Sequence, residues 1–178
     1  MTRKILAVVA LGLLAMAPAV ASAQLSTSIS LAGGLSMPKG DGSDQIDNGY
    51  NAAVGLNLGA PLLPVGIRIE GAYNNFNAKG NTTNNSANVN IASGTVNATF
   101  GLGMPYIIGG VGYYTSGGSA TVSGVKTTFD RTNAMGINGG VGIKLPFPML
   151  SPFAEIRYHK VYGDIDSSYI PVTVGITF

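Results

Sequence analysis

The sequence contains no cysteine, and His159 is its single histidine. Without cysteine the protein has no disulfide framework, no thiolate metal site and no cysteine nucleophile. One histidine alone also lacks the ligand set of a typical zinc site. Only 10% of the residues are charged, well below the roughly 25% of an average soluble protein. We therefore expect no metal site and no cofactor.

Long apolar runs are also scarce, and the one near the N-terminus is too short to span a bilayer. Arg3 and Lys4 precede an apolar stretch over residues 5–17, and Ala21-Ser22-Ala23 then supplies a small-residue cleavage site. A transmembrane helix needs about 20 apolar residues, so an uncleaved anchor is the weaker alternative. A basic start, a short apolar segment and a small-x-small site predict a secretory signal peptide over residues 1–23.

The mature chain, residues 24–178, is long enough for one domain. Arg3 and Lys4 leave with the signal peptide, so eight of the ten basic residues remain to balance eight acidic ones. This balance argues against nucleic-acid binding. An exported chain with 25 glycines after residue 23, few charges and no helical span there favours a closed β-barrel in an outer membrane. There every backbone polar group must be paired inside the protein.

Apolar residues alternate with small or polar residues in eight segments, which form four hairpins. Successive side chains of a strand point to opposite faces, so each segment has one apolar face and one thin, polar face. The last segment carries an apolar row of Ile170, Val172, Val174, Ile176 and Phe178. The eight predicted strands cover residues 25–37, 49–60, 65 to about 75, 89–103, 106–115, 133–145, 153–162 and 169–178.

The fourth of these segments changes phase partway along. Val89 and Ile91 share one parity, whereas Val96 and Phe100 share the other. We expect either a β-bulge near Ser93-Gly94 or an outer rim that turns inward.

The connections alternate between long polar loops and short turns marked by proline. Outer-membrane barrels show this asymmetry, with short periplasmic turns and longer extracellular loops. The fold prediction is all-β, an eight-stranded antiparallel transmembrane up-and-down β-barrel. A soluble barrel with its apolar residues inside is the alternative. The predicted long loops are residues 38–48, 74–88 and 116–132, residues 163–168 form a short loop, and the short turns are residues 61–64, 104–105 and 146–152.

Six ionisable side chains fall mid-strand on the predicted inner face. The interior of an eight-stranded barrel is just wide enough for side chains to fill it, and buried charges must be paired. We expect a salt-bridge core in which Glu70 and Glu155 are shared among Arg68, Arg157 and Lys144. A narrow ion or small-solute path through the same residues is the alternative. The interior charge cluster comprises Arg68, Glu70, Lys144, Glu155, Arg157 and His159.

An enzymatic function would have to use His159 as a general base. Lipid-modifying outer-membrane barrels of the lipid A deacylase type use a His/Ser/Glu arrangement near the last strands. Here Val161 stands two residues after His159, and no glutamate follows Glu155. We therefore predict no catalytic, cofactor-binding or metal site, and no enzyme activity.

Loop acids and outward aromatics have simpler explanations than ligand sites. The aspartates of the first and fourth loops lack the spacing of a calcium loop, so we expect solvated charge. Lys160, outward near the extracellular rim, could contact lipopolysaccharide phosphate or snorkel. Aromatic side chains on the lipid side suit the interfacial girdles of a membrane barrel. The loop aspartates are Asp41, Asp44, Asp47, Asp164 and Asp166, and the aromatics are Tyr50, Tyr73, Phe100, Tyr113, Tyr158 and Phe178.

Three segments resemble the small outer-membrane barrel family that includes the OmpA transmembrane domain and OmpX. They are Pro105-Tyr-Ile-Ile-Gly-Gly-Val-Gly-Tyr-Tyr114, Phe153-Ala-Glu-Ile-Arg-Tyr158 and the strand ending at Phe178. The resemblance implies that the last strand is the signal read by the outer-membrane assembly machinery, through Ile170, Val172, Val174, Ile176 and Phe178. Nothing follows Phe178, so a barrel-only, OmpX-like protein is expected rather than one with a peptidoglycan-binding domain.

The expected partners follow from this location. They are outer-membrane lipid and lipopolysaccharide, the assembly machinery with its periplasmic chaperones, and an extracellular ligand held by the loops. The predicted function is a structural or surface-interaction role for a monomeric barrel in the cell outer membrane. The two alternatives are the narrow channel and the lipid-modifying enzyme.

Overall fold

The computed structural model describes residues 26–40, 43–59, 63–82, 85–147, 149–163 and 167–178. The predicted signal peptide and three of the five loop aspartates, Asp41, Asp164 and Asp166, lie outside these ranges. Within the described residues, no helix is long and apolar enough to cross a membrane. A single short 3-10 helix, η1 (Ser43–Gln45), interrupts the first long loop of this described part.

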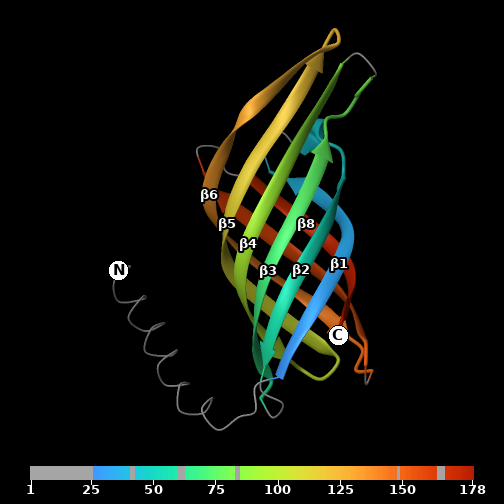
Figure 1. The fold of residues 1–178 in the computed structure, drawn as a ribbon, viewed down its shortest axis with the longest axis vertical. Coiled ribbons are helices and arrows are strands. Elements are labelled where there is room, and N and C mark those ends of the chain that lie inside the picture. The colour runs from blue at the N-terminus through green and yellow to red at the C-terminus, as the bar shows by residue number, and fades with distance from the viewer. Residues whose placement is uncertain (1–25, 41–42, 60–62, 83–84, 148, 164–166) are drawn as a thin grey trace, which may run out of the picture.

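The described residues form eight strands that close into one antiparallel barrel (Figure 1). Each strand pairs with the next, and the first pairs with the last from Ser30↔Thr177 to Lys39↔Ser168. The eight-stranded fold class is thereby confirmed. The strands are β1 (Ser26–Lys39), β2 (Gly49–Gly59), β3 (Val65–Asn77), β4 (Ser86–Gly101), β5 (Pro105–Val122), β6 (Val125–Lys144), β7 (Ser151–Tyr162) and β8 (Ser167–Thr177).

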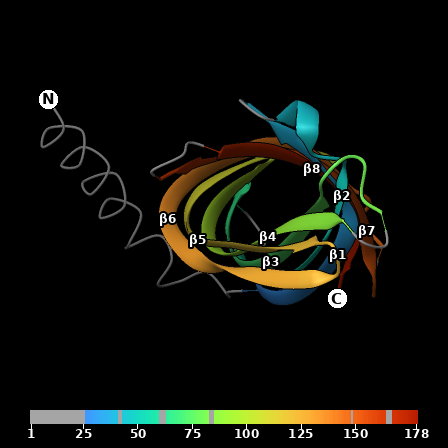
Figure 2. The same cartoon turned by 90° about the horizontal axis from the view of Figure 1, so that it is seen from above.

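The period-two alternation places apolar side chains outside and small or polar ones inside, as strand geometry requires. On β8, Val172 and Val174 are exposed, whereas Thr173 and Thr177 between and after them are buried. Looking down the barrel, Figure 2 shows the strands wrapped around the interior. All six aromatics expected on the lipid side are exposed: Tyr50, Tyr73, Phe100, Tyr113, Tyr158 and Phe178.

The phase change in β4 comes from an inward-turned segment and not from a bulge. The pairing of β4 with β3 and with β5 runs without a register shift through Ser93 and Gly94. Ile91 is buried in an apolar layer at one end of the interior, while Val89 remains exposed. Of the two expectations, the bulge is therefore wrong and the inward-turned rim holds for Ile91.

The predicted loop over residues 116–132 is instead a long hairpin. β5 continues to Val122 and β6 begins at Val125, with only Ser123 and Gly124 between them. Both turn residues have positive φ, 50° and 81°, which is typical of the type I′ turn that joins twisted strands. The abundance of Ser, Thr and Gly favoured a loop, but the flanking residues still alternate. Figure 1 shows this hairpin rising beyond the rest of the barrel.

Candidate functional site in the barrel interior

The charged side chains of the interior come from two strands on opposite sides of the barrel. Arg68 and Glu70 lie on β3, while Glu155, Arg157 and His159 lie on β7. Residues two apart on a strand face the same side, so each set points inward together. All five are buried, with at most 6% of their surface exposed.

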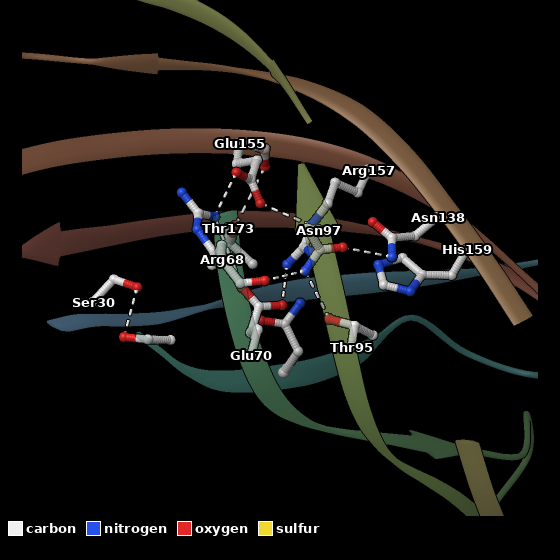
Figure 3. Close-up of polar contacts among 12 residues, drawn as sticks. Ser30, Arg68, Glu70, Thr95, Asn97, Asn138, Glu155, Arg157, His159 and Thr173 are labelled. Carbon is white, nitrogen blue, oxygen red and sulfur yellow. Dashed lines mark hydrogen bonds and ion pairs between the residues drawn. The ribbon is translucent and has the colours of Figure 1, made fainter. Parts of the chain in front are cut away.

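Four of these residues form a buried network of ion pairs, which we call the ion-pair quartet: Arg68, Glu70, Glu155 and Arg157 (Figure 3). Arg68 Nη1 lies 2.9 Å from Glu155 Oε2 and 3.8 Å from Glu70 Oε2. Arg157 Nε lies 2.7 Å from Glu155 Oε1, and Arg157 Nη2 contacts Glu70 Oε1. Each arginine therefore meets both carboxylates, and the quartet carries no net charge.

Neutral groups add hydrogen bonds to the quartet. Tyr106 on β5 donates its hydroxyl to Glu155 Oε2 at 2.6 Å. Arg68 Nε donates to Asn57 Oδ1 at 2.8 Å, and the guanidinium lies 5.4 Å from the centre of the Phe153 ring. Hydrogen bonds and a nearby aromatic face offset the cost of removing these charges from water.

Glycines make room for these long side chains. Gly140 and Gly142 on β6 are the register partners of Arg157 and Glu155. A Cβ at Gly140 would overlap the Arg157 side chain, and one at Gly142 would overlap the Tyr106 ring. The close approach of side chain to backbone at these two positions requires glycine.

Lys144 departs from the expected arrangement. It ends β6, pairs with Phe153 in register and is half-buried. Within the described part of the chain it forms no ion pair, because both carboxylates are already held by the two arginines. The expectation that Lys144 shares Glu70 and Glu155 does not match this geometry.

His159 belongs to an aromatic group rather than to the quartet. Its Nδ1 lies 3.0 Å from the Tyr114 hydroxyl, and its ring stacks on Tyr169 with centroids 4.8 Å apart. Among the described residues its Nε2 has no hydrogen-bond partner. His159 is therefore held by one hydrogen bond and one stacking contact, both with tyrosines.

The other buried side chains of the interior were, apart from Ile91, not named as inward-facing by sequence analysis. Asn97 lies near the centre, accepting from Asn138 Nδ2 at 2.8 Å and donating to Thr95 Oγ1 at 2.8 Å. Beside His159 lies a compact apolar layer of side chains that are at most 5% exposed. Each of these residues lies an even number of positions from an inward-facing residue of its strand, and this spacing could have identified it from the sequence. The apolar layer consists of Phe76, Ile91, Tyr114, Val161 and Tyr169.

The described residues hold no group of three or more His, Cys, Asp or Glu side chains that could bind a metal ion. Of the loop aspartates, Asp44 and Asp47 are described; Asp44 lies in η1 and Asp47 donates its backbone N–H to Asn77 O. On the outer surface, the Lys160 ammonium lies 5.4 Å from the centre of the Tyr162 ring.

Comparisons with known proteins agree with this architecture. A family model described as outer membrane protein beta-barrel domain matches residues 6–178. No curated protein sequence matches the chain.

Among solved structures, the chain is similar to Ail, the attachment invasion locus protein of Yersinia pestis, with TM-score 0.60 and 15% identity over 85% of this chain and 97% of Ail. It is also similar to Neisserial surface protein A, with TM-score 0.59 and 9% identity over 86% and 97% of the two chains. The N-terminal β-barrel domain of Pseudomonas aeruginosa OprF matches with TM-score 0.51 and 15% identity, over 87% and 100%. At these identities the likeness shows the shared fold alone.

Proposed function

Since the chain belongs to the outer membrane protein β-barrel domain family, we propose that it is a non-conducting, non-enzymatic barrel whose role lies at its extracellular surface. The barrel anchors the chain in the outer membrane through its outward apolar rows. The long β5–β6 hairpin, at the end opposite the C-terminus in Figure 1, is then the part that reaches beyond the membrane. The barrel works as a monomer in the membrane, in contact with lipid and lipopolysaccharide.

The observation that carries this proposal is the filled interior. The ion-pair quartet crosses the barrel from β3 to β7, and the apolar layer of Phe76, Ile91, Tyr114, Val161 and Tyr169 lies next to it. An aqueous pore would need a continuous polar path wide enough for a hydrated ion. Paired charges in series with tightly packed apolar rings oppose such a path.

An enzymatic role finds no support in the described geometry. Buried His159 contacts Tyr114 and stacks on Tyr169, and neither ring orients a nucleophile. The described residues also contain no metal-ligand cluster that could activate water.

Export and assembly complete the proposal. Residues 1–23 act as the signal peptide, and the last strand is read by the assembly machinery and its periplasmic chaperones. The outward row Ile170, Val172, Val174, Ile176 and Phe178 is available to such a partner because none of its members is buried.

Single-channel recording in planar bilayers tests the filled interior. The wild-type barrel is expected to show no steady openings, and Lys144→Ala serves as a control outside the ion-pair quartet. A combined variant that removes one ion pair and opens the apolar layer, Glu70→Ala/Arg157→Ala/Tyr114→Ala/Tyr169→Ala, is expected to conduct if it still folds. Steady wild-type openings that disappear in Arg157→Ala would overturn the proposal.

Folding of every variant is checked by heat-dependent mobility on SDS gels. A closed barrel migrates differently before and after boiling. A variant that shows no shift is unfolded and is excluded from the conductance comparison. A wild-type chain with no shift would contradict the membrane barrel itself.

A further inference from the structure

The outer half of β6 has one open edge. β6 runs from Val125 to Lys144, but β7 pairs with it only from Met135↔Tyr162 to Lys144↔Phe153. Residues 125–129 and 132–134 pair with β5 on one side, and among the described residues no strand pairs with the other side of residues 125–134. Residues 125–133 are all exposed. An unpaired strand edge is a template for pairing with another chain.

The turn determines which backbone groups this edge offers. The residues flanking a two-residue hairpin turn form a hydrogen-bonded pair, here Val122 and Val125. Hydrogen-bonded and non-hydrogen-bonded positions then alternate along the antiparallel pair. Lys126 and Thr128 therefore direct their N–H and C=O groups away from β5, toward the open edge.

A register shift bounds the regular part of the edge. Gly118 pairs with Phe129 and Ser116 pairs with Thr132, so β6 carries one extra residue, at Asp130 and Arg131. The pairing with β5 is regular from Val125 to Phe129, and Asp130 is the next residue along the edge. Along it the side chains of Lys126, Thr128 and Asp130 share one face, because they are two residues apart.

We infer that this edge pairs with the same edge of a second copy of the chain, antiparallel and centred on Thr128. In that register Lys126 of each copy lies opposite Asp130 of the other, so two opposite-charge pairs flank a Thr128–Thr128 contact. The groups that face the open edge are also those that an antiparallel ladder needs. Cross-strand pairs of opposite charge stabilise a sheet, whereas like charges destabilise it. This inference rests on the proposed surface role and names its partner.

The direction of the strands dictates where the two copies sit. In one membrane all copies point the same way, so neighbouring β6 edges run parallel. Antiparallel pairing requires two barrels that face each other from opposed membranes. Residues 125–134 span about 30 Å at roughly 3.3 Å per residue, which gives the hairpin reach beyond its own membrane. The chain then acts as a homotypic contact between two outer-membrane surfaces.

One short edge makes a weak contact, and a surface carries many copies. Multiple weak contacts between two surfaces raise the overall avidity by orders of magnitude. A single barrel in dilute detergent therefore stays monomeric. A competing antiparallel register, centred on Thr127, places Val125 opposite Phe129. Lys126 then no longer lies opposite Asp130, so reversing the charge at either residue distinguishes the two registers.

The test uses outer-membrane vesicles shed from a host with truncated lipopolysaccharide, which present the hairpin outward. Vesicles carrying the wild-type chain are expected to aggregate, as measured by light scattering. Lys126→Asp and Asp130→Lys each place like charges opposite one another and are expected to slow aggregation about tenfold or more. Thr128→Pro removes an edge N–H that β5 does not use and is expected to have the same effect.

The decisive arm mixes the two reversed variants. Lys126→Asp vesicles and Asp130→Lys vesicles, labelled with different dyes, restore both opposite-charge pairs across the contact and are expected to co-aggregate. Wild-type aggregation that ignores both reversals, or mixed vesicles that stay apart, would overturn the register and the inference. Wild-type vesicles that do not aggregate would overturn it as well. None of these three outcomes bears on the non-conducting barrel, since that proposal is tested by conductance.

Discussion

The imidazole of His159 lies flat against the ring of Tyr169, with 15° between the two planes and 4.8 Å between their centroids. The two residues are register partners across β7 and β8. Tyr114 meets the same imidazole edge-on from β5 and hydrogen-bonds its Nδ1. The single histidine of the chain is therefore held by three strands at the boundary between the ion-pair quartet and the apolar layer.

Removing the Tyr114 hydroxyl tests this arrangement. Tyr114→Phe leaves the buried Nδ1 of His159 without its partner, and we expect a loss of about 1–3 kcal/mol in the free energy of unfolding. Tyr113→Phe, on the outward face of the same strand, is the matched control and should change it by less than about 0.5 kcal/mol. The chain has no tryptophan, so urea unfolding in detergent is followed by circular dichroism. Equal effects of the two substitutions would contradict a structural role for the hydrogen bond.

Glu155 joins both arginines of the quartet, so its removal should be costly. Glu155→Ala leaves Arg68 and Arg157 only partly compensated inside the barrel, and we expect a destabilisation of about 3–5 kcal/mol. Lys144→Ala, at a half-buried site outside the quartet, should cost less than about 1 kcal/mol. The temperature at which the folded gel band disappears ranks the variants. A Glu155 variant as heat-resistant as the Lys144 variant would show that the quartet adds nothing to stability.

Two glycines of the β5–β6 pair lie on opposite faces of the barrel wall, Gly142 on the inner face and Gly109 on the outer face, so replacing each with alanine compares the two faces. Gly142→Ala places a methyl group against the Tyr106 ring, so we expect a loss of about 1–3 kcal/mol from overpacking. At Gly109, on the outer face, a Cβ would meet Asn138 O at 3.6 Å, which is ordinary contact. Gly109→Ala should therefore be neutral or stabilising by up to about 1 kcal/mol. The reverse order in the urea midpoints would mean that the two faces have been exchanged.

Phe178 closes the barrel through its backbone as well as carrying an exposed ring. Its N–H donates to Ile29 O at 2.9 Å, and the Ile29 N–H donates to Phe178 O at 2.8 Å. Deletion of Phe178 removes both bonds and the terminal aromatic, and should lower the folded protein in outer-membrane fractions several-fold while leaving export intact. Phe178→Ala keeps the backbone pair and reports on the ring alone.

Phe147→Ala, at an exposed aromatic between β6 and β7, is the control for nonspecific effects of losing a ring. If the deletion variant reaches the outer membrane at the wild-type level, Phe178 is not part of an assembly signal.

Sequence analysis predicted the strand segments well where alternation was clean, as in β2, β7 and β8. It missed the β5–β6 extension, because Ser, Thr and Gly are common both in loops and in the exposed part of a hairpin. It also left two options for β4, since a buried Ile91 and a bulge produce the same change of phase. Neither question can be decided from composition, because each depends on which strand lies beside the segment.

The interior shows the same division. The sequence predicted an inward position for each of Arg68, Glu70, Glu155 and Arg157 from parity alone. It also predicted that Lys144 shares the two carboxylates, but among the described residues only the two arginines form ion pairs with them. Parity says which face a side chain takes, but Lys144 sits where β6 ends, while the carboxylates are already held further inside.

The sequence by itself determined the faces of this protein. Period-two alternation is a local property, so eight strands, an apolar exterior and a polar interior could be derived residue by residue. Only the tertiary structure decided which side chains meet. Arg68 and Glu155 are 87 residues apart and touch because closure of β8 onto β1 brings β3 and β7 across one narrow interior. The open edge of β6 has the same origin, since it exists only because β7 is shorter than its neighbour.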